Sequence, residues 1–216
     1  MCRQHPHRYR PLRPPDPGSE SGYQPCDPME RRLGAMLLNL GLGNQRIQVR
    51  DLEPRDENDV LALFCAAEDW FVAATGRPAA PGDVQSLYYG LPEGAAFEDK
   101  ALLVITADGR VVGVIDAVLR HPTAETCSLG LFLVHPAHRR HGLGRLAASA
   151  LLGELASQGC TDVVASVAEG WQPGLKFLGA LGFSFQSPRT PANANRNLGP
   201  GERRVIPARL RLPPGR

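Results

Sequence analysis

Between Val134 and Arg145 the chain reads VHPAHRRHGLGR. The apolar run that precedes this segment, from about Cys127, predicts a strand, and the apolar residues that follow it recur at helical spacing. Gly142 and Gly144 let the backbone approach a ligand closely, and the start of a helix adds a partial positive charge. A strand, a basic glycine loop and a helix in this order predict an anion site suited to a pyrophosphate.

Side chains of the same segment add to this charge. Arg139, Arg140 and Arg145 can grip phosphate oxygens in a forked geometry. The helix that starts at the second glycine is expected to reach about Leu155, and Gly159 is suited to end it. Backbone and side-chain groups of one short segment therefore favour the same anionic ligand.

The surrounding chain, from about residue 45 to residue 187, alternates between strand and helix patterns. Strands are predicted at 46–52, 101–106, 111–119, 127–134, 162–167 and 183–186, and helices at about 54–71, 83–89, 143–155 and 174–181. Asp108-Gly109 is a strong signal for a hairpin turn, and such short turns imply antiparallel neighbours.

Three features of this region resemble a known family. The hexad Arg139-x-x-Gly142-x-Gly144 is similar to the acyl-CoA signature of the GNAT superfamily of acyl-CoA N-acyltransferases. A strand ending in Val-His-Pro precedes the hexad, and a Gly-Phe pair, Gly182-Phe183, follows a strand and a second helix, as in that family. The resemblance covers about residues 45–187, and the order and spacing of the elements make it specific.

The resemblance implies both a fold and a co-substrate. The fold would be α/β (α+β), with one domain and a mixed, mostly antiparallel sheet, splayed beside the signature strand and flanked by helices. Acetyl-CoA would be the co-substrate, with its pantetheine arm along the signature strand and its pyrophosphate over the glycine loop. The implied CoA-binding residues are Leu131, Phe132, Leu133, Val134, Arg139, Arg140, His141, Gly142, Leu143, Gly144 and Arg145.

The resemblance also implies a reaction, the transfer of an acetyl group to a primary amine. Backbone N–H groups near Leu133 would polarise the thioester carbonyl, as an oxyanion hole does. The amine would then attack directly, and the CoA thiolate would leave.

The acid–base half of the site departs from the family pattern. Leu178 stands where many members carry the tyrosine that protonates the thiolate, Trp171 replaces a common asparagine, and Ser128 stands at the position of a glutamate base. A protonated amine with a pKa of about 10 must lose a proton before it attacks. The candidates for the general base are Glu125, Asp116 or a chain of water molecules.

A dinucleotide-binding enzyme is the strongest alternative, because the same glycines fit G-x-G-x-x-A and Asp162 follows Gly142 by twenty residues. However, seven residues separate Val134 from the first glycine, and the upstream strands read as hairpins rather than βαβ units. A non-catalytic module that keeps the acyl-CoA fold is the third interpretation, since the usual tyrosine and glutamate are missing.

Histidines of the glycine loop also invite a metal interpretation. His135, His138 and His141 repeat at every third position, but no carboxylate or cysteine stands at ligand spacing. The five cysteines are scattered and form no CxxC pair, which argues against a disulfide framework or a zinc site. No metal is therefore expected.

Charge and composition divide the chain into three regions. Residues 45–187 contain 11 basic and 17 acidic side chains, whereas residues 188–216 contain seven arginines and one glutamate. We expect a flexible Pro/Arg-rich extension at 1–44, the N-acetyltransferase domain at 45–187, and a basic tail at 188–216. The tail has one alternating piece, Val205 to Leu212, which could add an edge strand. Both tails are expected to be dispensable for catalysis.

The same composition bears on partners and location. Few aromatic residues interleave the basic charges, so no nucleic-acid partner is expected. No apolar run approaches the ~18 residues of a membrane-spanning helix, so no membrane partner is expected. The cysteine pattern fits a reducing cytoplasm, and homodimerisation, common in such folds, is left open.

One feature of the sequence, an excess of acidic residues, bears on the acceptor amine. Residues 51–69, which the resemblance places beside the acceptor, carry seven acids against Arg55. Much of this excess fits a solvated helix face, and the remainder favours a cationic acceptor, either a small molecule or a protein amine.

Overall fold

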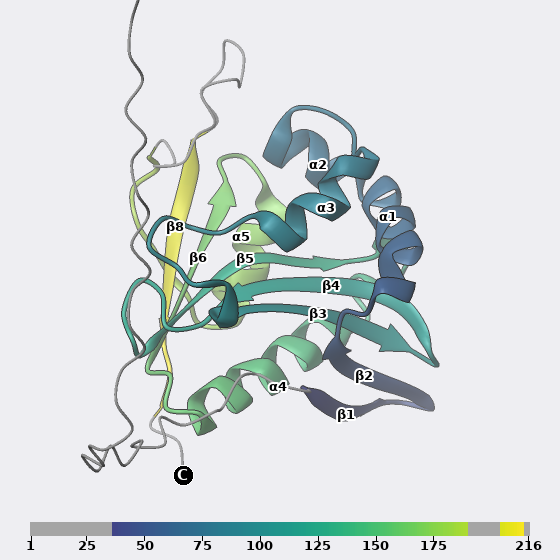
Figure 1. Ribbon diagram of the computed structural model, residues 1–216, viewed down its shortest axis with the longest axis horizontal. Helices are drawn as coiled ribbons and strands as arrows, with labels where there is room; N and C mark the ends of the chain where they lie inside the picture. Colours follow the sequence, from purple (N-terminus) through teal and green to yellow (C-terminus); the bar gives the residue numbers. More distant parts are fainter. Residues whose placement is uncertain (1–35, 190–203, 214–216) are drawn as a thin grey trace, which may run out of the picture. The chain divides into compact units, whose positions relative to one another are not determined.

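The computed structural model describes residues 36–189 and 204–213 (Figure 1). The chain divides into two units, Met1–Glu30 and Arg31–Arg216, and every described residue belongs to the second. Most of the predicted extension at 1–44 therefore lies outside the described residues. None of the helices within the described ranges is both long and apolar enough to cross a membrane.

Eight strands and five α-helices make up the described part of the chain. The strands are β1 (Leu37–Leu42), β2 (Gln45–Asp51), β3 (Lys100–Ala107), β4 (Arg110–Val118), β5 (Thr126–Val134), β6 (Asp162–Ala168), β7 (Ser184–Phe185) and β8 (Val205–Arg211). The helices are α1 (Glu57–Ala66), α2 (Glu68–Thr75), α3 (Pro81–Tyr89), α4 (Leu143–Ser157) and α5 (Gln172–Ala180), with short 3-10 turns at Pro54–Asp56, Phe97–Asp99 and Pro136–His138.

The strands form one mixed sheet in the order β1-β2-β3-β4-β5-β6-β8-β7. Every neighbouring pair is antiparallel except β5 and β6, which run parallel because α4 carries the chain back between them. The Asp108-Gly109 turn joins β3 to β4, and both residues have positive φ, as this tight hairpin requires. The predicted fold class, a mixed and mostly antiparallel sheet flanked by helices, is confirmed.

Two apolar cores lie on opposite faces of the sheet (Figure 1). On one face α4 and α5 pack against the sheet, and α4 contributes apolar residues such as Leu151 and Leu155. On the other face α1, α2 and α3 bury the predicted stripe that includes Val60 and Phe64. Adjacent residues of a strand contribute their side chains to different cores, since successive side chains point to opposite faces of a sheet.

The first two helices differ from the single helix that the apolar spacing predicts. Ala67, with φ −94° and ψ 38°, interrupts the helix and separates α1 from α2. Ala67 and Phe71 are nevertheless buried in the same core as the rest of the stripe. The break redirects α2, and this direction matters for the cavity described below.

The sheet begins earlier than the predicted boundary at residue 45. Strand β1 pairs with β2 from Leu37↔Arg50 to Leu42↔Gln45, and Gly43 makes the turn with φ +60°. Its burial alternates between exposed and half-buried positions, and its apolar run is interrupted by Asn39 and Gly41. The folded region therefore includes at least residues 37–44, which were assigned to the extension.

The structure also differs from the predicted C-terminal tail. Strand β8 does not lie at the outer edge of the sheet, because it is paired on one side with β6 and on the other with the short β7. Its pairing with β6 runs from Val205↔Ala168 to Arg211↔Asp162, and Ala208 is buried. Residues 205–211 are thus part of the domain rather than of a dispensable tail.

Candidate active site

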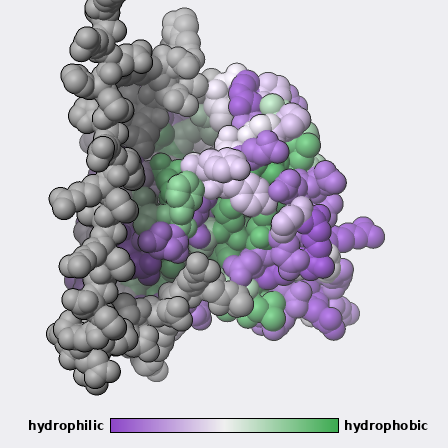
Figure 2. All heavy atoms as spheres, viewed as in Figure 1, coloured by the Kyte–Doolittle hydropathy of each residue, from purple (hydrophilic) through white to green (hydrophobic). Residues whose placement is uncertain are grey.

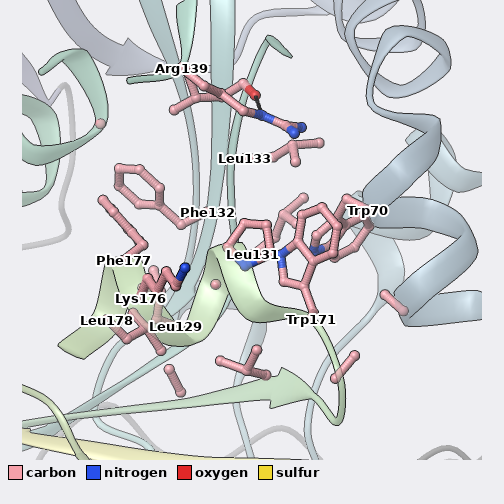
Figure 3. A pocket seen from close by; sticks show the side chains of 18 of the residues that line it. Trp70, Leu129, Leu131, Phe132, Leu133, Arg139, Trp171, Lys176, Phe177 and Leu178 are labelled. Carbon is pink, nitrogen blue, oxygen red and sulfur yellow. Dashed lines mark hydrogen bonds between the residues drawn. The ribbon is translucent and has the colours of Figure 1, made fainter. Parts of the chain in front are cut away.

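The sheet opens between β5 and β6. Their parallel register runs from Thr126↔Asp162 to Leu129↔Ala165 and ends there, although both strands continue. A cavity of about 690 Å³ occupies the space beyond, lined by residues of both strands (Figure 3). The V-shaped splay beside the signature strand is therefore present in this chain.

A β-bulge on β5 marks the point where the splay begins. Asp116 of β4 lies opposite Leu131, whereas Ala117 lies opposite Leu129, so Gly130 is the extra residue. The bulge reverses the alternation of the strand: Leu129 packs on the core beneath α4, and Leu131 belongs to the core beneath α1 to α3. Residues of one strand thereby line the cavity from both faces of the sheet.

The glycine loop stands at the mouth of this cavity. A 3-10 turn at Pro136–His138 follows β5, and Arg140 (φ 68°) and Gly142 (φ +86°) then turn the chain into α4. The carbonyl of Gly142 accepts a hydrogen bond from the N–H of Leu146 at 2.9 Å, which starts the helix. The N–H groups of the first turn have no partner within the helix, so the helix presents a positive end toward the cavity.

Gly144 allows α4 to pack closely at this end. A methyl group placed on it would lie 3.4 Å from Cε2 of Phe177 and 3.6 Å from Cγ2 of Val134. Phe177 in turn packs on Phe132 with the ring centroids 5.2 Å apart. The second glycine of the signature therefore brings α4, α5 and β5 together, in addition to its role in the loop.

Arg139 is held by two partners rather than projecting freely. Its Nε donates to the carbonyl of Val134 at 2.8 Å, and its Nη1 and Nη2 donate to the carboxylate of Asp69 at 2.6 and 3.3 Å. Asp69 belongs to α2, so this ion pair joins α2 to the glycine loop across 70 residues of sequence. Because α2 also packs near β6, it closes one side of the splay.

His135 contributes to the loop as a neutral imidazole. Its Nδ1 accepts a hydrogen bond from the N–H of Ala137 at 3.2 Å. Burial, together with electrostatic interaction with His138 and Arg139, lowers the pKa of His135, which favours this unprotonated form. Within the described residues, no group of three or more His, Cys, Asp or Glu side chains is placed to hold a metal ion.

Nine of the eleven implied CoA-binding residues line the cavity. They are Leu131, Phe132, Leu133, Val134, Arg139, Arg140, Gly142, Gly144 and Arg145. The other two do not: His141 is exposed, and the side chain of Leu143 is buried in the core beneath α4. The backbone of these two residues remains part of the loop between lining residues.

The two candidates for the general base lie in different places. Glu125 precedes β5 at the end of the strand opposite the glycine loop, and it does not line the cavity. Asp116 lies across the bulge: a methyl group placed on Gly130, which lines the cavity, would be 3.5 Å from its Oδ2. Its Oδ1 accepts a hydrogen bond from Nζ of Lys100 at 2.8 Å. Burial raises the pKa of Asp116, and the ammonium of Lys100 opposes this shift.

The positions that depart from the family pattern are also located. Leu178 and Trp171 both line the cavity, whereas Ser128 does not and instead donates to the carbonyl of His121 at 3.0 Å. Tyr88 and Tyr89, the two tyrosines of α3, lie outside the cavity. Among the described residues, therefore, no tyrosine hydroxyl lines the cavity where the family places its acid.

Several lining residues are not evident from the sequence. The most informative are Trp70 and Ala74 of α2, Ser166 and Ala168 of β6, and Lys176 of α5. Lysine is rare in this chain, which contains two among 24 basic residues, and both lie at or beside the site. That rarity is the one signal by which Lys176 could have been noticed.

The geometry excludes the dinucleotide-binding interpretation. A Rossmann glycine turn joins its strand directly to its helix within a parallel sheet. Here a 3-10 turn separates β5 from the glycines, and β5–β6 is the single parallel pair among the described strands. The splayed strand, the basic glycine loop and the helix N-terminus together define the class of acyl-CoA-dependent acyltransferases.

Comparison with known proteins gives the family. Residues 65–183 match the model of the acetyltransferase (GNAT) family, which is more than half of the chain, so this chain belongs to that family. It is an acetyltransferase that uses acetyl-CoA as its co-substrate. No curated protein sequence matches the chain.

Solved structures agree on the fold. An acetyltransferase from Thermus thermophilus is 22% identical, with a TM-score of 0.58 over 77% of this chain and 97% of that one. The ribosomal-protein-S18-alanine N-acetyltransferase from Escherichia coli is 18% identical, with a TM-score of 0.55 over 77% and 94%. The protein yncA from Salmonella typhimurium, solved with its cofactor acetyl-CoA, is 19% identical, with a TM-score of 0.56 over 77% and 94%.

Proposed function

We propose that this acetyltransferase transfers the acetyl group to a primary amine by direct attack. Acetyl-CoA, when bound, supplies an activated thioester that a neutral amine attacks while the CoA thiolate leaves. The observation that carries the proposal is the cavity in the splay of β5 and β6, with the positive end of α4 at its mouth. The lining of this cavity extends from the glycine loop to the bulge at Gly130, so co-substrate and acceptor can meet inside the cavity.

Each part of the cavity has a distinct role in this proposal. The loop from Arg139 to Gly144 and the first turn of α4 bind the pyrophosphate. The β5 backbone from Leu131 to Val134, which has no β6 partner in the register, pairs with the pantetheine arm and polarises the thioester carbonyl. Leu178 provides no proton, so the thiolate leaves as an anion into a cavity whose charged lining is cationic.

The test of this function is release of free thiol from acetyl-CoA in the presence of primary amines. We expect thiol release that depends on the amine, and one acetylated amine per thiol by mass spectrometry. A folded protein that binds acetyl-CoA in isothermal titration, yet releases no thiol with any of a broad panel of amines, would show that the acceptor is not a primary amine.

We further propose Asp116 as the group that accepts the proton of the amine. Gly130 is the residue between its carboxylate and the cavity, and a glycine there leaves room for an amine or one water molecule to approach. The raised pKa of Asp116 brings it closer to that of a useful base than an exposed carboxylate would be. Glu125 is assigned no role, because it lies at the other end of β5.

Asp116→Asn is expected to lower turnover at pH 7 by about 100-fold, at the low end of general-base effects. The loss should shrink as the pH rises toward the pKa of the amine, near ~10, since the amine is then deprotonated by the solvent. The variant also removes the carboxylate partner of Lys100, which keeps its hydrogen bond to the carbonyl of Gly90 at 2.7 Å, so its melting temperature and its affinity for acetyl-CoA must be measured alongside. Glu125→Gln is the control and should leave turnover unchanged. Equal loss at every pH in a folded, CoA-binding Asp116→Asn protein would rule out the role of base.

A further inference from the structure

The charges that line the cavity are all cationic. Arg139 and Arg140 from the glycine loop, Arg145 from α4 and Lys176 from α5 line the cavity, and no carboxylate of the described residues does. Among the described residues, the carboxylate of Asp116 lies beside the cavity, behind Gly130, and can meet one ammonium group. Further ammonium groups of a polycation would find no carboxylate in the lining, and desolvation without a partner is costly. Because the three arginines are assigned to the pyrophosphate, the lack of carboxylates in the lining, rather than its positive charge, disfavours a polycation.

The acidic residues near the first helices do not change this balance. None of the seven acids between residues 51 and 69 lines the cavity. Asp56 is buried against Arg50, with oxygen–nitrogen distances of 2.6 and 2.8 Å, and Asp69 is paired with Arg139. Figure 2 shows hydrophilic side chains gathered over α1, on the outer surface of the domain. Their excess is thus a feature of the solvated surface and of ion pairs rather than of the cavity.

The cavity wall away from the basic loop is mostly apolar and aromatic, with Ser166 and Lys176 as its polar side chains. Trp70 projects into it from α2, and Trp171 projects into it from the turn between β6 and α5 (Figure 3). Leu131 and Leu133, which the bulge turns toward α1 to α3, belong to the same core face as Trp70. Trp171 and the Phe132–Phe177 pair pack against the opposite core, beside α4 and α5, so the two indoles approach the cavity from the two faces of the sheet.

Two contacts fix Trp70 in this position. Its ring packs edge-on against Phe71 with the centroids 4.9 Å apart, and Phe71 is buried in the core of the helices. The neighbouring Asp69 ties the same turn of α2 to Arg139. The indole of Trp70 is therefore part of a preformed cavity wall. An indole face attracts both flat apolar groups and a single cation.

We infer that the acceptor is a monoamine carried on a flat apolar body, such as an arylalkylamine, which lies against Trp70 and Trp171. This inference rests on the proposed transfer to a primary amine and narrows it to one class of amine. The apolar body replaces water at the indole faces, and the single amino group reaches the bulge at Gly130, between the two faces of the sheet.

The test compares primary amines of similar basicity in the thiol-release assay: tryptamine and 2-phenylethylamine, ethylamine without an apolar body, and the polyamines putrescine and spermidine. We expect kcat/KM for tryptamine to exceed that for each polyamine at least 10-fold. Trp70→Ala should lower kcat/KM for tryptamine about 10-fold or more, mainly through KM, and leave ethylamine nearly unchanged. Trp70→Phe should restore most of the loss, and Tyr89→Ala, an exposed aromatic on α3 outside the cavity, is the matched control.

Each contrary outcome has a separate meaning. Polyamines used as well as tryptamine would overturn the inference and leave the transfer to amines standing. An equal effect of Trp70→Ala on tryptamine and ethylamine would also overturn it, since Trp70 would then act on the site as a whole. Absence of transfer to every amine, with acetyl-CoA binding intact, would overturn the proposed function and this inference with it.

Discussion

Replacement of Gly142 by valine is expected to weaken the binding of acetyl-CoA at least 100-fold in a protein that still folds. Gly142 precedes α4 with φ +86°, a conformation that a β-branched residue adopts only under strain of about 1–3 kcal/mol. The loop can relieve this strain by shifting, which moves the N–H groups of the first turn away from the pyrophosphate. A 100-fold loss corresponds to about 2.8 kcal/mol of binding free energy.

Gly159→Val provides a matched control for this prediction. Gly159 follows the other end of the same helix with φ +87°, and it does not line the cavity. Both variants should lose a similar amount of stability in thermal unfolding, and isothermal titration should show loss of acetyl-CoA binding in the Gly142→Val protein alone. Equal affinities in the two variants would contradict the assignment of the pyrophosphate to this loop.

Removal of residues 204–216 is expected to unfold the domain, or at least to lower its melting temperature by more than about 15 °C. β8 is paired with β6 at seven positions, and each net backbone hydrogen bond contributes about 0.5–1.5 kcal/mol. The deletion also removes the buried side chains of Ala208 and Leu212 and the ion pair between Arg209 and Asp162, with Nε and Oδ1 2.9 Å apart. The summed loss is comparable with the whole stability of a typical domain, about 5–15 kcal/mol.

Circular dichroism during heating measures this effect, with removal of residues 1–28 as the comparison. The N-terminal segment has no apolar periodicity in its sequence, so its removal should shift the melting temperature by no more than about 3 °C. A deletion of residues 204–216 that melts within the same margin as the full chain would contradict the structural role of β8. The same measurement tests the sequence-based prediction that both tails are dispensable, against which the pairing of β8 with β6 argues.

The glycine loop illustrates how much of the site can be predicted from sequence. Its strand, its two glycines and the helix after them are neighbours in the chain, and their conformations follow from local rules: apolar periodicity, positive φ at Gly142 and a helix start. Nine of the residues implied by the family resemblance accordingly line one cavity. The fold class was predictable for the same reason, since hairpin turns such as Asp108-Gly109 specify which strands are neighbours.

The unpredicted strand β1 and the position of β8 in the sheet show the limit of local rules. β1 is interrupted by Gly41 and β8 by Pro207, and each becomes a strand because a partner strand satisfies its backbone. Whether Val205–Arg211 lies at an edge or between β6 and β7 depends on pairing energies between segments that are far apart in the chain. No spacing within the segment encodes that choice.

The sequence by itself determined the glycine loop and the mixed sheet, because both arise from residues that are close together in the chain. Only the tertiary structure decided which side chains from distant parts of the chain line the cavity. The break at Ala67 redirects α2, the Asp69–Arg139 pair spans 70 residues to hold it beside the glycine loop, and Trp70 thereby enters a wall that also includes Trp171. The bulge at Gly130 turns Leu131 to the opposite face and places Asp116 beside the cavity. These contacts join residues far apart in sequence, and packing between elements, rather than the propensity of any one of them, brings them together.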